Sequence, residues 1–419
     1  MAEQIDAEAV WKKVEATDAP QVKKACVAFS GGLDSSLGIE LLRRRYRAEE
    51  IVAINVDVGQ GEDEQKECAE KAKMLEIEPI YLDAKKEFVD NWLTKAIRAN
   101  SDYLGYPVST SMTRQLIAKV VGKKAAELGC DAVLEGSTGK GNDQYRMHNV
   151  FGMFAPGVKV LAFVRDFDLT RGEESALCKM WGVPVSEQIT GGDDKTMWCR
   201  SIASGAIGLD QELPDDIWQW YVPPEKAQDK AENVTIEFKE GIPVVMNGKG
   251  MALDDLIAEL NVIAGRNGIG YIDMWEDGIM SLKSREIYEA PAAHVILKLH
   301  RDVEGSCLTK EERLYKAGIE QTWAMMTYHG EWFHPLHAAL DAFVAETQKV
   351  VNGTLTAKLY RGNITIVKRE LGDSSLFAPE IRDIKKRGFD QRWSANAAKI
   401  RGLPFDILAV RAQKTGIEL

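Results

Sequence analysis

Between residues 23 and 137, short apolar runs alternate with longer stretches of helical periodicity, and this alternation constrains the fold more than any other feature of the chain. The apolar runs predict buried strands over 23–30, 51–59, 79–84 and 131–137. The stretches between them predict helices over 35–46, 62–76, 86–100 and 113–129. Strands joined through helices run parallel, because a helical crossover returns the chain to the same end of the sheet. The sequence therefore predicts an α/β domain whose parallel sheet is covered on both faces.

The alternation stops near residue 185, which predicts a second domain of a different kind. A stretch rich in Gly, Asp and Pro (186–230) precedes an expected hairpin (234–248) and an expected helix (253–268). Further strands are expected over 294–300 and 354–370, so this domain should be α+β. The expected divisions are an N-terminal extension (1–20), a nucleotide-binding domain (21–185), an α+β domain (186–370) and a C-terminal helical extension (371–419).

Charge and hydropathy argue against several classes of partner. The 53 Lys and Arg residues are outnumbered by 64 Asp and Glu residues, whereas nucleic-acid binding depends on basic side chains that neutralise phosphates. The apolar runs are shorter than the roughly 18 residues that span a bilayer. The first residues are acidic and lack an apolar signal core, which predicts a cytoplasmic protein. The six cysteines are too widely spaced for a paired-cysteine motif. We therefore expect no nucleic-acid partner, no membrane and no metal held by protein side chains.

The first chemistry-bearing motif follows the first predicted strand. It consists of Ser30, Gly31, Gly32, Leu33, Asp34, Ser35 and Ser36. Two adjacent glycines let the backbone turn and expose consecutive N–H groups at the start of a helix, and three hydroxyls add donors. The spacing is not that of a Walker A loop, which needs a following Gly-Lys-Ser or Gly-Lys-Thr. A plain glycine-rich turn with a capping Asp or Ser is the alternative, but the full run favours a phosphate-binding loop.

The second motif, residues 136–146, follows the strand predicted over 131–137. Three glycines separate the polar side chains Thr138, Lys140, Asn142, Asp143 and Arg146. Such a concentration of donors and charges at the carboxyl end of a parallel strand is typical of a ligand site. A solvated polar loop is the alternative reading.

The two motifs together carry a family resemblance. The run 30–36 resembles the pyrophosphate-binding loop of the PP-loop ATP pyrophosphatase superfamily, and the run 136–146 resembles the signature of the argininosuccinate synthase family. Later blocks are also similar, over 56–63, 106–119, 198–205, 267–291, 328–335 and 389–404. The resemblance implies an adenine nucleotide α-hydrolase-like domain, a synthetase domain, and a C-terminal oligomerisation segment that forms a homotetramer.

The same resemblance implies an AMP-forming C–N ligase. It would join L-citrulline to L-aspartate through a citrullyl-adenylate, giving argininosuccinate, AMP and pyrophosphate in arginine biosynthesis and the urea cycle. ATP would be the co-substrate and would carry Mg²⁺ on its phosphates. Two alternatives stay open from the residues themselves: an adenylating PP-loop ligase with another oxygen-bearing acceptor, and a non-catalytic nucleotide sensor.

Site residues follow from the positions that match the family motifs. Those implied for the nucleotide are Ala28, Phe29, Ser30, Gly31, Gly32, Leu33, Asp34, Ser35, Ser36, Val56 and Gly136. Those implied for citrulline are Tyr106, Ser111, Arg114, Asn142, Arg146, Ser201, Glu276 and Tyr288, and those for aspartate are Thr138, Asn142 and Asp143. Arg146 suits a carboxylate and Glu276 suits an ammonium group.

Catalysis would involve Lys140 as the cation over the developing phosphate charge, Asp143 facing the aspartate amine, and Asp34 as an orienting carboxylate. Two positions depart from the family pattern. Ser35 stands where the family usually has Thr, which preserves the hydroxyl. Gly192 stands where the family has Ser, so one hydroxyl contact to citrulline is either lost or supplied by Thr196.

Overall fold

The protein consists of two compact units, Met1–Ser374 and Ser375–Leu419. The computed structural model describes residues 5–183, 193–202 and 212–418. Among these residues, no helix has both the length and the apolar character needed to cross a membrane.

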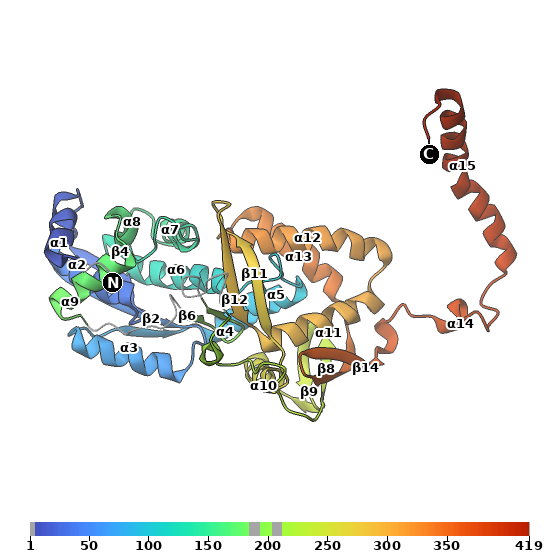
Figure 1. The fold of residues 1–419 in the computed structure, drawn as a ribbon, viewed down its shortest axis with the longest axis horizontal. Coiled ribbons are helices and arrows are strands. Elements are labelled where there is room, and N and C mark those ends of the chain that lie inside the picture. Colours follow the sequence, from blue (N-terminus) through green and yellow to red (C-terminus); the bar gives the residue numbers. More distant parts are fainter. Residues whose placement is uncertain (1–4, 184–192, 203–211, 419) are drawn as a thin grey trace. The chain divides into compact units, whose positions relative to one another are not determined.

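A parallel five-stranded sheet organises the N-terminal part of the first unit (Figure 1), and its strand order is β3-β2-β1-β4-β5. All four pairings are parallel, so the predicted α/β class is confirmed. The strands are β1 (Lys24–Ala28), β2 (Glu50–Asp57), β3 (Ile80–Asp83), β4 (Ala132–Glu135) and β5 (Lys159–Ala162). The sequence prediction included the first four strands and missed β5.

Helices cover both faces of this sheet. The helices of this part of the chain are α1 (Ala7–Ala16), α2 (Leu33–Arg44), α3 (Glu62–Met74), α4 (Lys85–Phe88), the π-helical turn η1 (Val89–Leu93), α5 (Thr94–Arg98), α6 (Thr110–Glu127), α7 (Asp143–Phe154), α8 (Phe163–Asp166) and α9 (Arg171–Trp181). Successive strand residues point to opposite faces. Cys26 of β1 belongs to the core cluster that contains Leu116 of α6, whereas the adjacent Val27 belongs to the cluster that contains Leu37 of α2. Figure 1 shows α6 and α3 on opposite sides of β2.

The N-terminal helix α1 is part of this packing. Val10 and Val14 are buried, and the Trp11 ring meets the Trp181 ring of α9 edge-on with 5.0 Å between centroids. Lys13 Nζ lies 3.4 Å from a carboxylate oxygen of Glu173.

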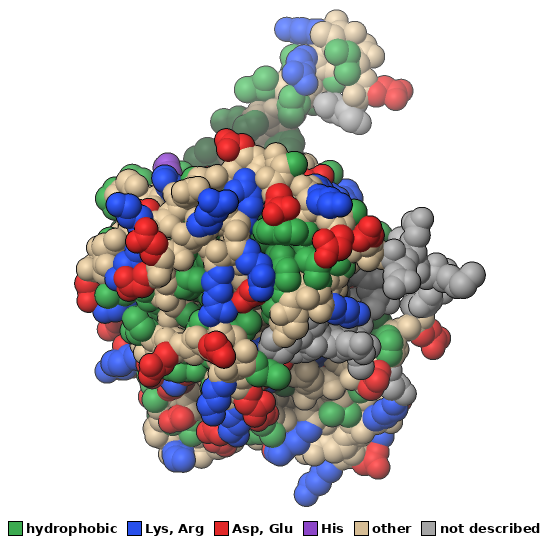
Figure 2. Space-filling model, turned by 90° about the vertical axis from the view of Figure 1, so that its left-hand side faces the viewer, with side chains coloured by type: hydrophobic (Ala, Val, Ile, Leu, Met, Phe, Trp, Pro, Cys, Tyr) green, Lys and Arg blue, Asp and Glu red, His purple; other side chains and the backbone are tan. Residues whose placement is uncertain are grey.

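Acidic and basic side chains are interspersed among the coloured residues of the face shown in Figure 2.

The rest of the first unit contains helices and two antiparallel sheets, which confirms the predicted α+β class of this part of the chain. Their strand orders are β10-β9-β8-β13-β14 and β11-β12-β7-β6. The strands are β6 (Asp193–Lys195), β7 (Arg200–Ile202), β8 (Glu232–Lys239), β9 (Ile242–Met246), β10 (Lys249–Gly250), β11 (Tyr271–Asp277), β12 (Lys283–Glu289), β13 (Gly353–Tyr360) and β14 (Asn363–Glu370). The helices are α10 (Leu253–Arg266), α11 (Pro291–Cys307), α12 (Lys310–Tyr328) and α13 (Pro335–Gln348), with the 3₁₀ turns η2 (Asp215–Ile217) and η3 (Gly372–Ser374).

The strand predicted over 294–300 is wrong, because this segment lies inside α11. Pro291 occupies the first turn of that helix, where the missing N–H costs nothing. Val295, Ile296, Leu297 and Leu299 are all buried, so the helix is apolar on several sides. A short, continuous apolar run has the same appearance in a buried helix as in a buried strand.

The second unit contains α14 (Pro379–Arg382), the 3₁₀ turn η4 (Gln391–Trp393) and the long helix α15 (Ser394–Thr415), which confirms the predicted C-terminal helix. None of these three described elements has a buried residue. Large apolar side chains are exposed in this unit, among them Phe377 at 72%, Ile384 at 89%, Trp393 at 69% and Phe405 at 71%.

Candidate active site

Two loops meet at the carboxyl edge of the parallel sheet. One follows β1 and the other follows β4, and these two strands are hydrogen-bonded neighbours. Gly136 of the second loop lies so close to Asp34 that a Cβ atom there would be 2.5 Å from the Asp34 Cβ. Gly31 turns the first loop at φ +77°, and a Cβ there would lie 2.9 Å from the Cα of Cys68. Both loops therefore need glycine in order to pack as they do.

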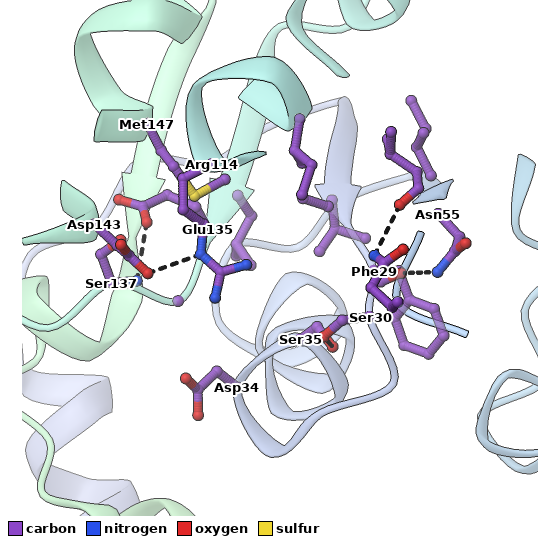
Figure 3. Close-up of a pocket in the computed structure, with 18 residues that line it drawn as sticks. Phe29, Ser30, Asp34, Ser35, Asn55, Arg114, Glu135, Ser137, Asp143 and Met147 are labelled. Carbon is purple, nitrogen blue, oxygen red and sulfur yellow. Dashed lines mark hydrogen bonds and ion pairs between the residues drawn. The ribbon is translucent and has the colours of Figure 1, made fainter. Parts of the chain in front are cut away.

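A cavity of about 190 Å³ opens beside these loops (Figure 3). Ser30 and Ser35 face each other there with 3.3 Å between their hydroxyl oxygens, and the Gly32 N–H donates to Ser30 Oγ at 3.2 Å. The residues predicted for the nucleotide that line this cavity are Ala28, Phe29, Ser30, Asp34, Ser35, Val56 and Gly136. Four others that the sequence predicted for it, Gly31, Gly32, Leu33 and Ser36, lie in the turn and the start of α2 and are not among the described lining residues.

A second cavity, of about 260 Å³, lies next to the first. The residues predicted for the amino-acid substrates that line it are Tyr106, Thr138, Asn142, Asp143, Arg146, Ser201, Glu276 and Tyr288. Four residues border both cavities: Asp34, Gly136, Ser137 and Asp143. The contact between the loops is therefore also the boundary between the two cavities.

Asp143 is held at this boundary by two arginines. Arg114 Nε lies 2.9 Å from one of its oxygens and Arg146 Nη1 lies 3.1 Å from the other (the first contact is drawn in Figure 3). Burial opposes ionisation of Asp143, but the two guanidinium groups outweigh it and hold its pKa below the ordinary value. Asp143 is therefore an ionised hydrogen-bond acceptor and a weak base.

Asp34 is held from the side of α9. Arg171 Nη1 lies 2.6 Å from Asp34 Oδ1. Glu174 is 2% exposed and hydrogen-bonds to the Asp34 side chain. Burial raises the pKa of Glu174 to about 9, and the negative charge of Asp34 adds to this effect. Glu174 is therefore neutral at pH 7.

At the far wall of the second cavity, a buried carboxylate accepts two phenol hydrogen bonds. Tyr288 and Tyr328 each donate to one oxygen of Glu276. Asn142 Nδ2 donates to the Tyr328 hydroxyl at 2.8 Å, and the Arg146 guanidinium lies over the Tyr328 ring, 4.7 Å from its centroid. This wall thus places a carboxylate and a guanidinium in one cavity, which suits the ammonium and carboxylate groups of a free amino acid.

Comparisons with known proteins agree with this arrangement. Residues 24–184 match the arginosuccinate synthase N-terminal HUP domain, and residues 192–408 match the arginosuccinate synthase C-terminal domain. The argininosuccinate synthase of Methanopyrus kandleri is 40% identical over 386 residues, which cover 91% of this chain and 98% of that protein. The chain belongs to the argininosuccinate synthase family.

Another member of the family, from Methanococcus maripaludis, is 41% identical over 387 residues, which cover 91% of this chain and 97% of that protein. Among solved structures, a U34-tRNA thiolase from Methanococcus maripaludis is similar over 43% of this chain and 65% of its own, at 18% identity and a TM-score of 0.32, a likeness too weak to support an inference. The domains of this family account for the parallel sheet and for the antiparallel sheets that follow it.

Some residues predicted from the family motifs lie elsewhere. Lys140 is exposed, borders neither cavity and has no hydrogen bond or ion pair to another described residue. Arg114 lines the first cavity rather than the second. Ser111 is fully buried, outside the described lining, and its hydroxyl has no partner among the described residues. Thr196 is also buried, and its hydroxyl forms hydrogen bonds with the Ser109 hydroxyl and the Trp198 N–H. Gly192 lies outside the described residues.

The sequence prediction missed six residues that line the second cavity: Thr110, Ser137, Gly141, Asp194, Glu286 and Tyr328. Tyr328 lies in the block 328–335, which resembles a block of the family. That resemblance could have drawn attention to Tyr328, but it predicted no role for this residue. Burial raises the pKa of Glu286 to about 7. Glu286 comes from β12 and Tyr328 from the end of α12, so only the tertiary structure brings them beside the second loop.

Proposed function

We propose that this chain joins L-citrulline to L-aspartate and converts ATP to AMP and pyrophosphate, as a step of arginine biosynthesis. The observation that carries the proposal is the boundary shared by the two cavities at Asp34, Gly136, Ser137 and Asp143. A triphosphate held by the loop 30–36 would present its α-phosphate where the second cavity begins. Family membership supports the same reaction.

The chemistry requires activation of a poor electrophile. Two nitrogens donate electrons into the citrulline carbonyl, so its carbon resists attack by an amine. The ureido oxygen attacks the α-phosphorus, pyrophosphate leaves, and a citrullyl-adenylate forms. The amine of aspartate then attacks the ureido carbon, and AMP leaves with the former ureido oxygen. The protein contributes mainly positioning and charge stabilisation for these displacements.

The residues of the second cavity would divide this work between them. Glu276 would bind the citrulline ammonium group and Arg146 its carboxylate. Thr138 and Asn142 would bind aspartate, while Asp143 would accept a hydrogen bond from its amine. Because two arginines hold the pKa of Asp143 low, we propose that it orients the amine and does not remove its proton.

We propose two further participants in the adenylation step. Lys140 would reach the phosphates when ATP is bound, since it is exposed in the second loop and has no competing partner among the described residues. Mg²⁺ would arrive on the phosphates of ATP and neutralise their charge. It prefers oxygen ligands, which the phosphates themselves supply.

Assembly and location complete the proposal. The exposed apolar side chains of residues 375–419 support docking on other copies of the chain, and the family resemblance implies a homotetramer. A cytoplasmic location is part of the same proposal, and participation in a urea cycle rests on that resemblance alone. Neither an adenylating ligase with another acceptor nor a nucleotide sensor is favoured by the comparisons.

The test is product analysis with the full chain. With ATP, citrulline and aspartate, the protein should form argininosuccinate, AMP and pyrophosphate in equal amounts. Omitting either amino acid should stop net synthesis. Ornithine lacks the ureido oxygen that attacks the α-phosphorus, so it should be inert and release no AMP. ADP and phosphate as products would contradict the proposal.

A further inference from the structure

Glu135 is a buried carboxylate that the proposed mechanism does not use. It is the last residue of β4, is 3% exposed and lines the first cavity. Its Oε2 accepts the Ser137 N–H at 2.9 Å, whereas its Oε1 is buried and has no hydrogen-bond partner among the described residues. Figure 3 shows the Glu135 carboxylate on the same side of the cavity as Met147, Asp143 and Ser137.

Such an atom calls for a reason, because buried polar atoms in proteins are nearly always paired. Burial raises the pKa of Glu135, and the hydrogen bonds from Ser137 offset this effect only in part. Glu40 is a useful contrast: it is also buried, at 7%, yet both of its oxygens are satisfied by Arg43 and Arg44. Glu135 therefore has one oxygen without the partner that each oxygen of Glu40 receives, and the residue lines the first cavity.

The position of Glu135 indicates which part of ATP it meets. The α-phosphate belongs at the boundary of the two cavities, and Gly136 and Ser137 of that boundary directly follow Glu135. Ribose is the group bonded to the α-phosphate, and adenine lies one step further away. The apolar side chains of Ile54, Val56 and Leu134 provide the surface that suits a base.

We propose that Glu135 recognises the ribose of ATP, with its unpaired Oε1 accepting a hydrogen bond from a ribose hydroxyl. This inference rests on the proposed function only in that ATP occupies the first cavity. It makes Glu135 a specificity-determining residue that distinguishes ribonucleotides from deoxyribonucleotides.

The experiment is calorimetric titration with ATP, 2′-deoxy-ATP, 3′-deoxy-ATP and N6,N6-dimethyl-ATP, without citrulline or aspartate. The wild-type chain should bind one of the deoxy analogues roughly 10- to 100-fold more weakly than ATP, the range expected for a hydrogen bond to a charged group. Glu135→Ala should bind ATP as weakly as the wild type binds that analogue, and should bind ATP and the analogue equally. The matched control is Glu40→Ala, which removes a buried but paired carboxylate and should keep the discrimination.

Glu135→Gln is a second variant that keeps the inference testable if Glu135→Ala does not fold. Its amide has the size of the carboxyl group but no charge, so its hydrogen bond to a ribose hydroxyl is weaker and the discrimination should also fall. Equal binding of all four nucleotides by the wild type, or unchanged discrimination in both Glu135 variants, would overturn the inference. The inference would also be overturned if the Glu135 variants lost only the discrimination between ATP and N6,N6-dimethyl-ATP. Because only binding is measured, a chain that discriminates between sugars but ligates nothing would refute the proposed function and leave this inference standing.

Discussion

Gly136→Ala tests whether the contact between the two loops sets the geometry of the reaction. The added Cβ would lie 2.5 Å from the Asp34 Cβ, whereas ordinary van der Waals contact begins at 3.4 Å. One loop must therefore move by about 0.9 Å. Rotation of the Asp34 side chain cannot relieve this clash, because a Cβ atom is fixed to its own backbone.

The displacement falls on the atoms that separate the two cavities, so its main cost should be kinetic. A misplacement of about 1 Å between reacting groups can lower a rate by roughly 100-fold. Overpacking itself destabilises a protein by about 1–3 kcal/mol. We therefore expect citrulline-dependent AMP release at saturating substrates to fall roughly 100-fold, while the variant remains folded with a lowered Tm.

The assay is chromatographic measurement of AMP, together with thermal unfolding followed by circular dichroism. Gly152→Ala is the matched control, because Gly152 lies in α7 with open space where its Cβ would be. It should keep the wild-type rate and gain up to about 1 kcal/mol of stability from its higher helix propensity. A Gly136→Ala variant with the wild-type rate would refute the argument that the loop contact positions the reactants.

Three other changes test separate parts of the account. Tyr328→Phe removes the hydroxyl that links Asn142 to Glu276, so we expect the KM for citrulline in AMP release to rise roughly 10-fold, with a smaller change in kcat. Glu174 has a pKa raised to about 9, so ionisation of this group in the unfolded chain makes the folded state progressively less stable between the ordinary glutamate pKa and about pH 9. Glu174→Gln should therefore have a higher Tm than the wild type at pH 8 but not at pH 4, and should keep its activity above pH 9, where wild-type activity falls. Removal of residues 375–419 should lower the particle mass in light scattering to that of a smaller assembly, and an unchanged subunit number would contradict the proposed docking role.

The parallel sheet and both loops could be predicted because their signals are local. A glycine pair after a buried strand, and a polar run around three further glycines, are properties of short segments. The contact between Gly136 and Asp34 follows from the pairing of β1 with β4, which the alternation of strands and helices does not specify. The sequence therefore indicated two ligand loops, and the structure shows that they touch.

The walls of the second cavity were harder to predict because they depend on distant segments. Tyr328 closes the hydrogen-bond chain from Asn142 to Glu276, yet 52 residues separate it from that carboxylate. A tyrosine at the end of a helix has no local pattern that distinguishes a site residue from a core residue. The strand prediction over 294–300 was wrong for a related reason. Because α11 is buried on several sides, this segment lacks the polar positions that would have shown its helical period.

The central claim is that the α-phosphorus of ATP faces the ureido oxygen of citrulline across the loop contact. Citrulline labelled with ¹⁸O in its ureido group tests this directly, through mass spectrometry of the AMP that the full chain releases. The account predicts one labelled oxygen in every AMP molecule formed with argininosuccinate. AMP without the label, formed at the same rate as argininosuccinate, would contradict it.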